Sequence, residues 1–171
     1  MQIFIHVPSQ TLDLLDPRGV LLRRYPCSTS KFGLGTEPGS NKTPTGHFRI
    51  AEKHGDDAPA GMIFKSRVAT GKFGSEQDEA DHVQTRILWL DGLDKANANT
   101  KSRYIYLHGT NAETRLGTPA SHGCVRMGND DIIELYDTVA IGTKVEISAD
   151  AERKPKRAKA RAKSSGATTE K

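Results

Sequence analysis

Short apolar runs with a period of two, separated by tight turns, constrain the fold of this chain more than any other feature. Residues 3–7 alternate between apolar and polar positions, which is typical of a half-buried strand. Residues 11–15 form a second run, the Asp16-Pro17-Arg18-Gly19 segment is a strong turn, and residues 20–27 form a third run. This opening meander predicts a mainly β domain.

The later segments predict more strands and one helix. Strands are expected at residues 47–50, 86–90, 104–107 and 143–147, with a helix from Asn129 to about Val139. Asn129 or an adjacent Asp suits the N-cap of that helix, and the apolar face predicted to pack on the core comprises Ile132, Leu135, Tyr136 and Val139. Residues 51–103 are harder to interpret, and His54 and His82 within them are expected to be solvated beside carboxylates.

Charge divides the chain into a globular part and a basic tail. The 171 residues, 35% of them hydrophobic, can form one domain with a real core, expected at residues 1–148. The net charge is +7 from Arg153 to Lys171 and −3 over residues 1–152. Residues 149–171 are therefore predicted to be a disordered basic tail.

The tail is expected to be mainly a solvated segment, and contacts with nucleic acid, anionic lipid or acidic polymers are the alternative. It has no interleaved aromatic residues, so specific recognition of nucleic acid is not predicted. The glycine-rich residues 28–46 do not predict a nucleotide site either, because G-L-G lacks the following x-x-G and no helix pattern follows.

The stretch from Tyr104 to Met127 carries the candidate chemistry. His108 follows a short apolar and aromatic run, Gly109 permits a sharp exit, and a polar loop leads to Ser121-His122-Gly123-Cys124. A cysteine with nearby histidines can form a thiolate nucleophile with a base. Taken alone, a cysteine and a histidine are more often a buried apolar group and a satisfied core or surface group.

The surrounding pattern favours the catalytic interpretation. The H-G-T at 108–110, the S-H-G-C at 121–124 and the following V-R-M strongly resemble the signature of the L,D-transpeptidase catalytic-domain (YkuD-like) family. The T-P-T-G at 43–46 resembles a second family signature, whose role is expected to be structural support below the site. The resemblance implies a mainly β, sandwich-like catalytic domain with one short helix after the nucleophile.

The resemblance also implies a role for each motif residue. Cys124 would be the nucleophile, His108 the proton acceptor and donor, and the Gly109 carbonyl the group that orients the imidazole. His122 would support the site geometry or the thiolate charge. Backbone N–H groups of Gly123 and Cys124 would form the oxyanion hole.

Two further residues are expected to contact the substrate, and no metal or organic cofactor is implied. Arg126 would hold a substrate carboxylate. Ser121 would lie in the substrate site, mainly as a hydrogen-bonding residue of the loop. The two cysteines are not expected to pair, because an active Cys124 thiolate argues against a disulfide with Cys27.

The reaction implied is acyl transfer from a peptidoglycan tetrapeptide stem. The stem peptide is thus the expected partner, with terminal D-Ala released and a thioester formed on Cys124. An amine acceptor makes the protein an L,D-transpeptidase and water makes it an L,D-carboxypeptidase, with amino-acid exchange as a third outcome. Two alternatives of other classes are an inactive module that binds wall peptides and a polyanion-binding protein that acts through its tail.

The first residues predict a cytoplasmic location. They contain no basic n-region, no long apolar h-region and no small-residue cleavage site, and no apolar run approaches membrane-spanning length. Recycled or precursor tetrapeptides would be the substrates there, which favours the carboxypeptidase as much as the transpeptidase. A misassigned start would instead allow a periplasmic or cell-envelope protein.

Overall fold

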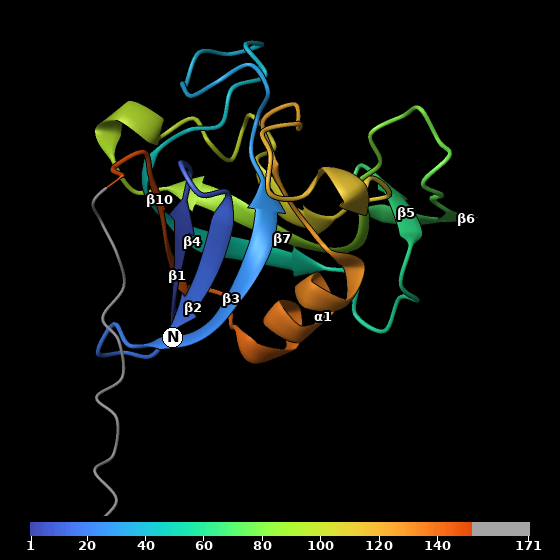
Figure 1. The fold of residues 1–171 in the computed structure, drawn as a ribbon, viewed down its shortest axis with the longest axis horizontal. Helices are drawn as coiled ribbons and strands as arrows, with labels where there is room; N and C mark the ends of the chain where they lie inside the picture. The colour runs from blue at the N-terminus through green and yellow to red at the C-terminus, as the bar shows by residue number, and fades with distance from the viewer. Residues whose placement is uncertain (152–171) are drawn as a thin grey trace, which may run out of the picture.

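The computed structural model describes residues 1–151 and consists of strands with one helix packed against them. A ten-stranded sheet accounts for most of the regular secondary structure (Figure 1). The strands are β1 (Gln2–His6), β2 (Thr11–Leu15), β3 (Leu21–Ser28), β4 (Gly46–His54), β5 (Met62–Lys65), β6 (Val68–Phe73), β7 (Gln84–Gly92), β8 (Tyr106–Gly109), β9 (Val125–Met127) and β10 (Lys144–Ser148). The helix is α1 (Asn129–Thr138), and two 3-10 turns lie at Lys95–Asn97 and Glu113–Arg115.

The sheet closes on itself. Its strand order is β4-β10-β1-β2-β3-β9-β8-β7-β5-β6, and an additional pairing joins β4 to β7. Most neighbouring strands are antiparallel, whereas β1 with β10 and β8 with β9 are parallel. The β5–β6 hairpin is attached to this closed part through β7 and projects to one side (Figure 1). The mainly β, sandwich-like domain with one short helix is confirmed.

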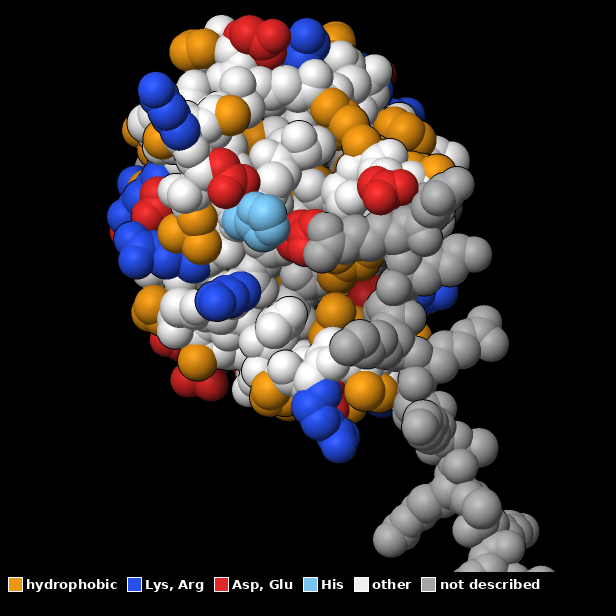
Figure 2. All heavy atoms as spheres, turned by 90° about the vertical axis from the view of Figure 1, so that its left-hand side faces the viewer, with side chains coloured by type: hydrophobic (Ala, Val, Ile, Leu, Met, Phe, Trp, Pro, Cys, Tyr) orange, Lys and Arg blue, Asp and Glu red, His pale blue; other side chains and the backbone are white. Residues whose placement is uncertain are grey.

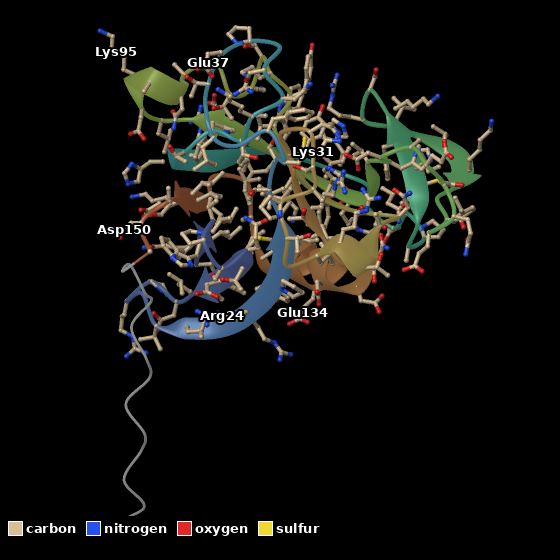
Figure 3. The ribbon with its side chains drawn as sticks, turned by 45° about the horizontal axis from the view of Figure 1, so that its top comes forward. Arg24, Lys31, Glu37, Lys95, Glu134 and Asp150 are labelled. Carbon is tan, nitrogen blue, oxygen red and sulfur yellow. The ribbon has the colours of Figure 1, made fainter. Side chains whose placement is uncertain are left out.

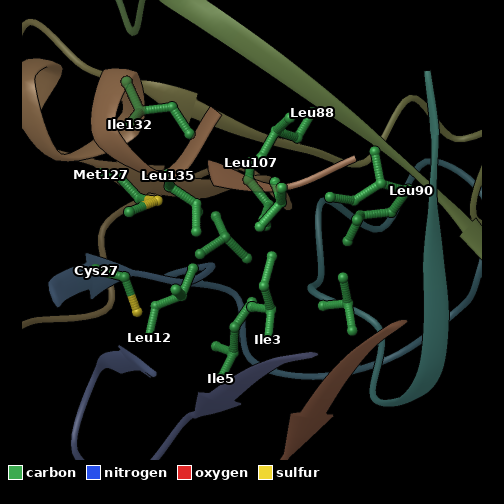
Figure 4. Close-up of a cluster of buried hydrophobic side chains, with 14 of the residues drawn as sticks. Ile3, Ile5, Leu12, Cys27, Leu88, Leu90, Leu107, Met127, Ile132 and Leu135 are labelled. Atoms are coloured by element: carbon green, nitrogen blue, oxygen red, sulfur yellow. The ribbon is translucent and has the colours of Figure 1, made fainter. Parts of the chain in front are cut away.

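The core lies between the inner faces of the strands and α1. Alternate residues of β1 and β2 point into it, together with Cys27, Leu107 and Met127 from the strands that lead to the motif (Figure 4). Residues 84–90 of β7 are all buried, because one face meets this core and the other meets a second apolar cluster. That second cluster is formed by Phe64, Ile87, Trp89 and Tyr106.

Two features of the strands differ from the sequence prediction. β6 was not predicted, because it is largely exposed and its sequence, V-A-T-G-K-F, has no clear alternation. The strand expected at 104–107 begins instead at Tyr106 and includes His108 and Gly109, while Tyr104 has a positive φ of 56° in the preceding turn. Gly109 is therefore not a turn residue. A Cβ there would lie 2.8 Å from the Gln84 carbonyl oxygen, so close packing requires the glycine.

The helix has the predicted position, but its N-cap is Gly128, in place of the expected Asn or Asp. The Asn129 side chain turns away from the helix axis, where Nδ2 donates to the Thr110 carbonyl at 3.0 Å and to Glu113 at 2.7 Å. Glu113 also accepts from the Asn129 backbone N–H at 2.6 Å. The Glu113 carboxylate thus lies at the first turn of α1, where it stabilises the positive end of the helix dipole.

Lys53 of β4 caps the C-terminal end of α1. Its Nζ donates to the carbonyls of Tyr136 at 2.6 Å and Val139 at 2.7 Å. Lys53→Met keeps most of the apolar stem but leaves both carbonyls without this donor. We expect it to lower the free energy of unfolding by about 1–2 kcal/mol. Urea denaturation measures the loss, and the exposed Lys72→Met serves as the control that should cost little.

The described surface carries charges of both signs. Basic and acidic side chains are interspersed on the face in Figure 2, as expected for a globular part with a small net charge. No helix within residues 1–151 is long and apolar enough to cross a membrane. The predicted basic tail, residues 149–171, falls outside the described part of the chain except for its first three residues.

Candidate active site

The two candidate catalytic residues are carried by neighbouring parallel strands. His108 of β8 is the register partner of Arg126 of β9, and Leu107 is the partner of Val125. Cys124 directly precedes β9, so it lies beside Tyr106 at the start of β8. Although the histidine and the cysteine are separated along the chain, the pairing of these two short strands places them on adjacent strands, two register positions apart.

The Cys124 thiol is partly exposed and is held by one backbone group at the start of β8 and one in the turn before it. Its Sγ accepts the Tyr106 N–H at 3.3 Å and lies 3.3 Å from the Tyr104 carbonyl oxygen, to which the thiol donates. The side chain also packs against the cluster that contains Trp89 and Tyr106. Both cysteines are free, and Cys27 is buried in the core.

The surroundings favour a neutral thiol over a thiolate. Burial raises the pKa of the Cys124 thiol to about 11, and the Asp81 carboxylate adds to the rise, while the Tyr106 N–H, Arg126 and Arg103 oppose it. At neutral pH the resting group is therefore a thiol, and a base must remove its proton during attack.

His108 has the properties of that base. Its ring is buried, and Nδ1 lies 2.6 Å from the Gly109 carbonyl oxygen. A carbonyl can only accept, so Nδ1 carries the proton and Nε2 keeps the lone pair that can receive another. Burial lowers the pKa of His108, although the Gly109 carbonyl and Asp81 act in the opposite direction. The Gly109 carbonyl thus occupies the orienting position that the family resemblance implies.

Hydrogen bonds between its own residues hold the loop before Cys124. Ser121 is buried, and its Oγ donates to the Cys124 carbonyl at 2.5 Å and accepts the Gly123 N–H at 3.3 Å. Ser121 is thus the hydrogen-bonding residue of the loop that was expected, and its hydroxyl contacts the Gly123 N–H, which was expected in the oxyanion hole. Gly123 has a φ of 121°, which only glycine adopts without strain.

Thr43 of the T-P-T-G segment supports this loop from below. It belongs to the long loop after β3, which carries Lys31 and Glu37 in Figure 3. The buried Thr43 hydroxyl donates to the Gly123 carbonyl at 2.9 Å and accepts the Ser30 N–H at 2.9 Å. The segment therefore lies where the expected structural support was placed.

Thr43→Val leaves these two buried backbone groups without their partner while keeping the side-chain shape. We expect it to reduce the free energy of unfolding by roughly 1–3 kcal/mol. Thermal or urea unfolding measures this, and Thr43→Ser, which retains the hydroxyl, should recover most of the stability. A Thr43→Val variant as stable as the wild type would contradict the proposed support.

Arg126 differs most from its expected place. Its side chain is only 3% exposed, and one guanidinium nitrogen contacts the Asp81 carboxylate. An internal ion pair therefore occupies the group that was expected to hold a substrate carboxylate. His122 is more exposed, its Nδ1 lies 3.1 Å from the same carboxylate, and its ring lies beside that of Phe32.

Sequence reasoning missed Asp81 and an aromatic wall beside Cys124. Asp81 stands in the acidic loop between β6 and β7, which no motif marks. The wall consists of Trp89, stacked on Tyr104 and edge-on to Tyr106, with Arg67 above the Trp89 ring at 4.5 Å from its centroid. The backbone atoms that contact the thiol belong to two wall residues, so the wall borders the nucleophile.

Comparison with known proteins places the chain in one family. The family model of the YkuD, L,D-transpeptidase catalytic domain matches residues 1–147. The Bacillus subtilis (strain 168) protein YkuD, which carries an L,D-transpeptidase name, is 29% identical over 147 residues. That match covers 85% of this chain and 65% of the relative, so this chain is similar to part of a longer protein.

Solved structures show the same fold at low sequence identity. An L,D-transpeptidase from Mycobacterium smegmatis has a TM-score of 0.55 and 19% identity, with 86% of this chain and 58% of that chain covered. An L,D-transpeptidase from Xylanimonas cellulosilytica DSM 15894 has a TM-score of 0.56 and 21% identity, with coverages of 85% and 59%. Because the family model matches residues 1–147, this chain belongs to the YkuD family of L,D-transpeptidase catalytic domains.

Proposed function

We propose that this protein transfers the acyl group of a peptidoglycan tetrapeptide stem through a thioester on Cys124. One observation supports this proposal above the others. The His108 Nδ1–H donates a hydrogen bond to the Gly109 carbonyl, which leaves Nε2 as the basic nitrogen on the strand next to the nucleophile. A buried neutral imidazole beside a thiol of high pKa suits general-base catalysis better than a preformed ion pair.

The first half of the reaction releases D-Ala. His108 takes the thiol proton as Sγ attacks the carbonyl carbon of the L-centre that precedes the terminal D-Ala. The tetrahedral intermediate collapses, its C–N bond breaks, and His108 returns the proton to the departing amine. The products are free D-Ala and a thioester between Cys124 and the remaining tripeptide.

The second half depends on the acceptor. His108 removes a proton from an amine or from water, the acceptor attacks the thioester carbonyl, and Cys124 leaves as a thiol. An amine of another stem gives a cross-link, an amino acid gives exchange, and water gives a tripeptide. A stem in the cytoplasm would meet water or free amino acids, whereas a stem in the cell envelope would meet neighbouring stems.

The developing oxyanion needs backbone donors. The N–H of Cys124 is the first candidate, because the Gly123 N–H is already engaged by Ser121 Oγ at 3.3 Å. That contact is long for an N–H···O bond, so a negatively charged oxygen could compete for the amide. The oxyanion hole in this proposal therefore forms fully only when the substrate carbonyl is attacked.

The test is mass spectrometry of a purified tetrapeptide incubated with the protein, with and without an amine acceptor. We expect the wild type to release D-Ala and Cys124→Ala to release none. Tripeptide shows hydrolysis, and dimer or exchanged product shows transfer to the amine. If the wild type releases no D-Ala in either condition, the enzymatic proposal for this substrate fails, and a module that binds wall peptides takes its place.

A further inference from the structure

Asp81 connects the two sides of the nucleophile. It lies in the loop between β6 and β7, and Oδ2 of its carboxylate contacts both the imidazole Nδ1 of His122 and the guanidinium of Arg126. These partners are the second residue before Cys124 and the second residue after it. A single carboxylate oxygen therefore bridges the loop that precedes the nucleophile and the strand that follows it.

The loop that carries Asp81 is fixed to the exit of the strand that carries His108. Asn111 is buried, and its Nδ2 donates to the Ala80 carbonyl at 3.0 Å and to the Ser75 carbonyl at 3.2 Å. Its Oδ1 accepts the His82 N–H at 3.1 Å. The residues on both sides of Asp81 are thus tied to a position three residues beyond His108.

Burial makes Arg126 dependent on this carboxylate. The Arg126 side chain is 3% exposed, and its Nε lacks a hydrogen-bond partner within the described part of the chain. A buried guanidinium must be compensated by a nearby anion, since its charge cannot be solvated. Asp81 supplies that anion, and its own pKa is held below the usual range mainly by the charges of His108 and Arg126, against the effect of burial.

We propose that Asp81 is a positioning residue that holds His122 and Arg126, and thereby keeps Cys124 aligned with the base on β8. Its effect on turnover rests on the proposed acyl-transfer function, whereas its effect on the thiol does not. A displacement of reacting groups by about 1 Å can cost on the order of 100-fold in rate. Asp81→Asn keeps the size of the side chain but removes the charge that both partners require.

The charged groups around the catalytic pair give this proposal a second readout. Asp81 and Arg126 face His108, while Asp81, Arg126 and Arg103 face Cys124. Asp81 is the negative member of this set, and it raises the pKa of the thiol. Asp81→Asn should therefore make Cys124 easier to ionise while making it a worse catalyst. Because unfolding would also expose the thiol and lower its pKa, both readouts are taken on protein that circular dichroism shows to be folded.

The experiment measures both properties in the full chain. Alkylation of Cys124 by iodoacetamide, followed by peptide mass spectrometry from pH 6 to pH 11, reports the ionisation of the thiol. D-Ala release from the tetrapeptide gives kcat/KM. For Asp81→Asn we expect the alkylation midpoint to move to lower pH and kcat/KM to fall roughly 100-fold, with partial recovery of kcat/KM in Asp81→Glu.

Glu79→Gln is the matched control. It removes the same charge from the same loop, from an exposed side chain two residues away. Both readouts should stay at the wild-type level in this variant. If Asp81→Asn does not fold, the double variant Asp81→Asn/Arg126→Met removes the buried charge as well, and we expect it to fold with kcat/KM still low.

The outcomes separate this proposal from the proposed function. An Asp81→Asn protein with wild-type kcat/KM and an unchanged alkylation profile overturns the positioning role, as does a double variant with wild-type turnover. A loss of thermal stability without a change in either readout also overturns it. If the wild type does not turn over the tetrapeptide, the acyl-transfer function fails while the alkylation profile still decides whether Asp81 acts on Cys124.

Discussion

Cys124→Ser is expected to lower D-Ala release by roughly 10⁴-fold or more, close to the limit of detection. Serine preserves the size of the side chain, and its hydroxyl can still accept the Tyr106 N–H that now meets Sγ. The hydroxyl proton is far harder to remove than a thiol proton, and a neutral buried imidazole is too weak a base to compensate. Single-turnover assays with the purified variant measure the loss.

Cys27→Ala is the control for this prediction. Cys27 is fully buried, and burial raises the pKa of its thiol to about 12, so it is not a nucleophile under the assay conditions. We expect Cys27→Ala to lower the unfolding midpoint through the small cavity it creates, with activity per folded molecule unchanged. Appreciable D-Ala release by Cys124→Ser would contradict the assignment of Cys124 as the nucleophile.

His108→Gln is expected to reduce kcat/KM by about 10³-fold at pH 7 and to abolish its dependence on pH in the acidic range. In the wild type, protonated His108 cannot accept the thiol proton, so activity should fall as the pH falls through the pKa of His108. Burial places that pKa below its ordinary value of 6.5, and the acidic limb should therefore lie below pH 6.5. Initial rates from pH 4 to pH 9 test the position of this limb.

The same shift predicts how stability changes with pH. A histidine whose pKa is lower in the folded protein binds fewer protons there than in the unfolded chain, so stability is fully present above pH 6.5 and declines as the pH falls toward the folded pKa. His108→Gln should remove this contribution, whereas His47→Gln, at an exposed site, should retain it.

For the activity of His108→Gln, an acidic limb of kcat/KM that persists in the variant would show that another group acts as the base.

Local sequence patterns predicted the elements that are buried in the core. The opening meander and the apolar side of α1 follow from alternation or helical spacing, and β7 follows from a continuous apolar run that suits a strand buried on both faces. β6 was missed because a mostly exposed hairpin strand is under no such selection. The N-cap was misassigned because Glu113, remote from the helix in sequence, supplies the carboxylate at its first turn.

The motif itself was readable from the sequence, whereas its electrostatics were not. Residues 108, 109, 122, 123 and 124 could be singled out by type and spacing, and the structure places the Gly109 carbonyl on His108 as the resemblance implies. The substrate contacts expected of Arg126 and Ser121 stay predictions. Both side chains are buried: Arg126 pairs with Asp81, which lies outside the motif, and Ser121 is the expected hydrogen-bonding residue of the loop.

By itself, the sequence determined a mainly β domain, one helix after the motif, and a cysteine and a histidine as candidate catalytic groups, because periodicity and residue type are local properties. Only the tertiary structure decided that the sheet closes through β4 and β7, that Trp89 and Tyr104 border the thiol, and that Asp81 bridges both sides of Cys124. These features depend on contacts between residues far apart in the chain, whose partners are selected by strand register and burial.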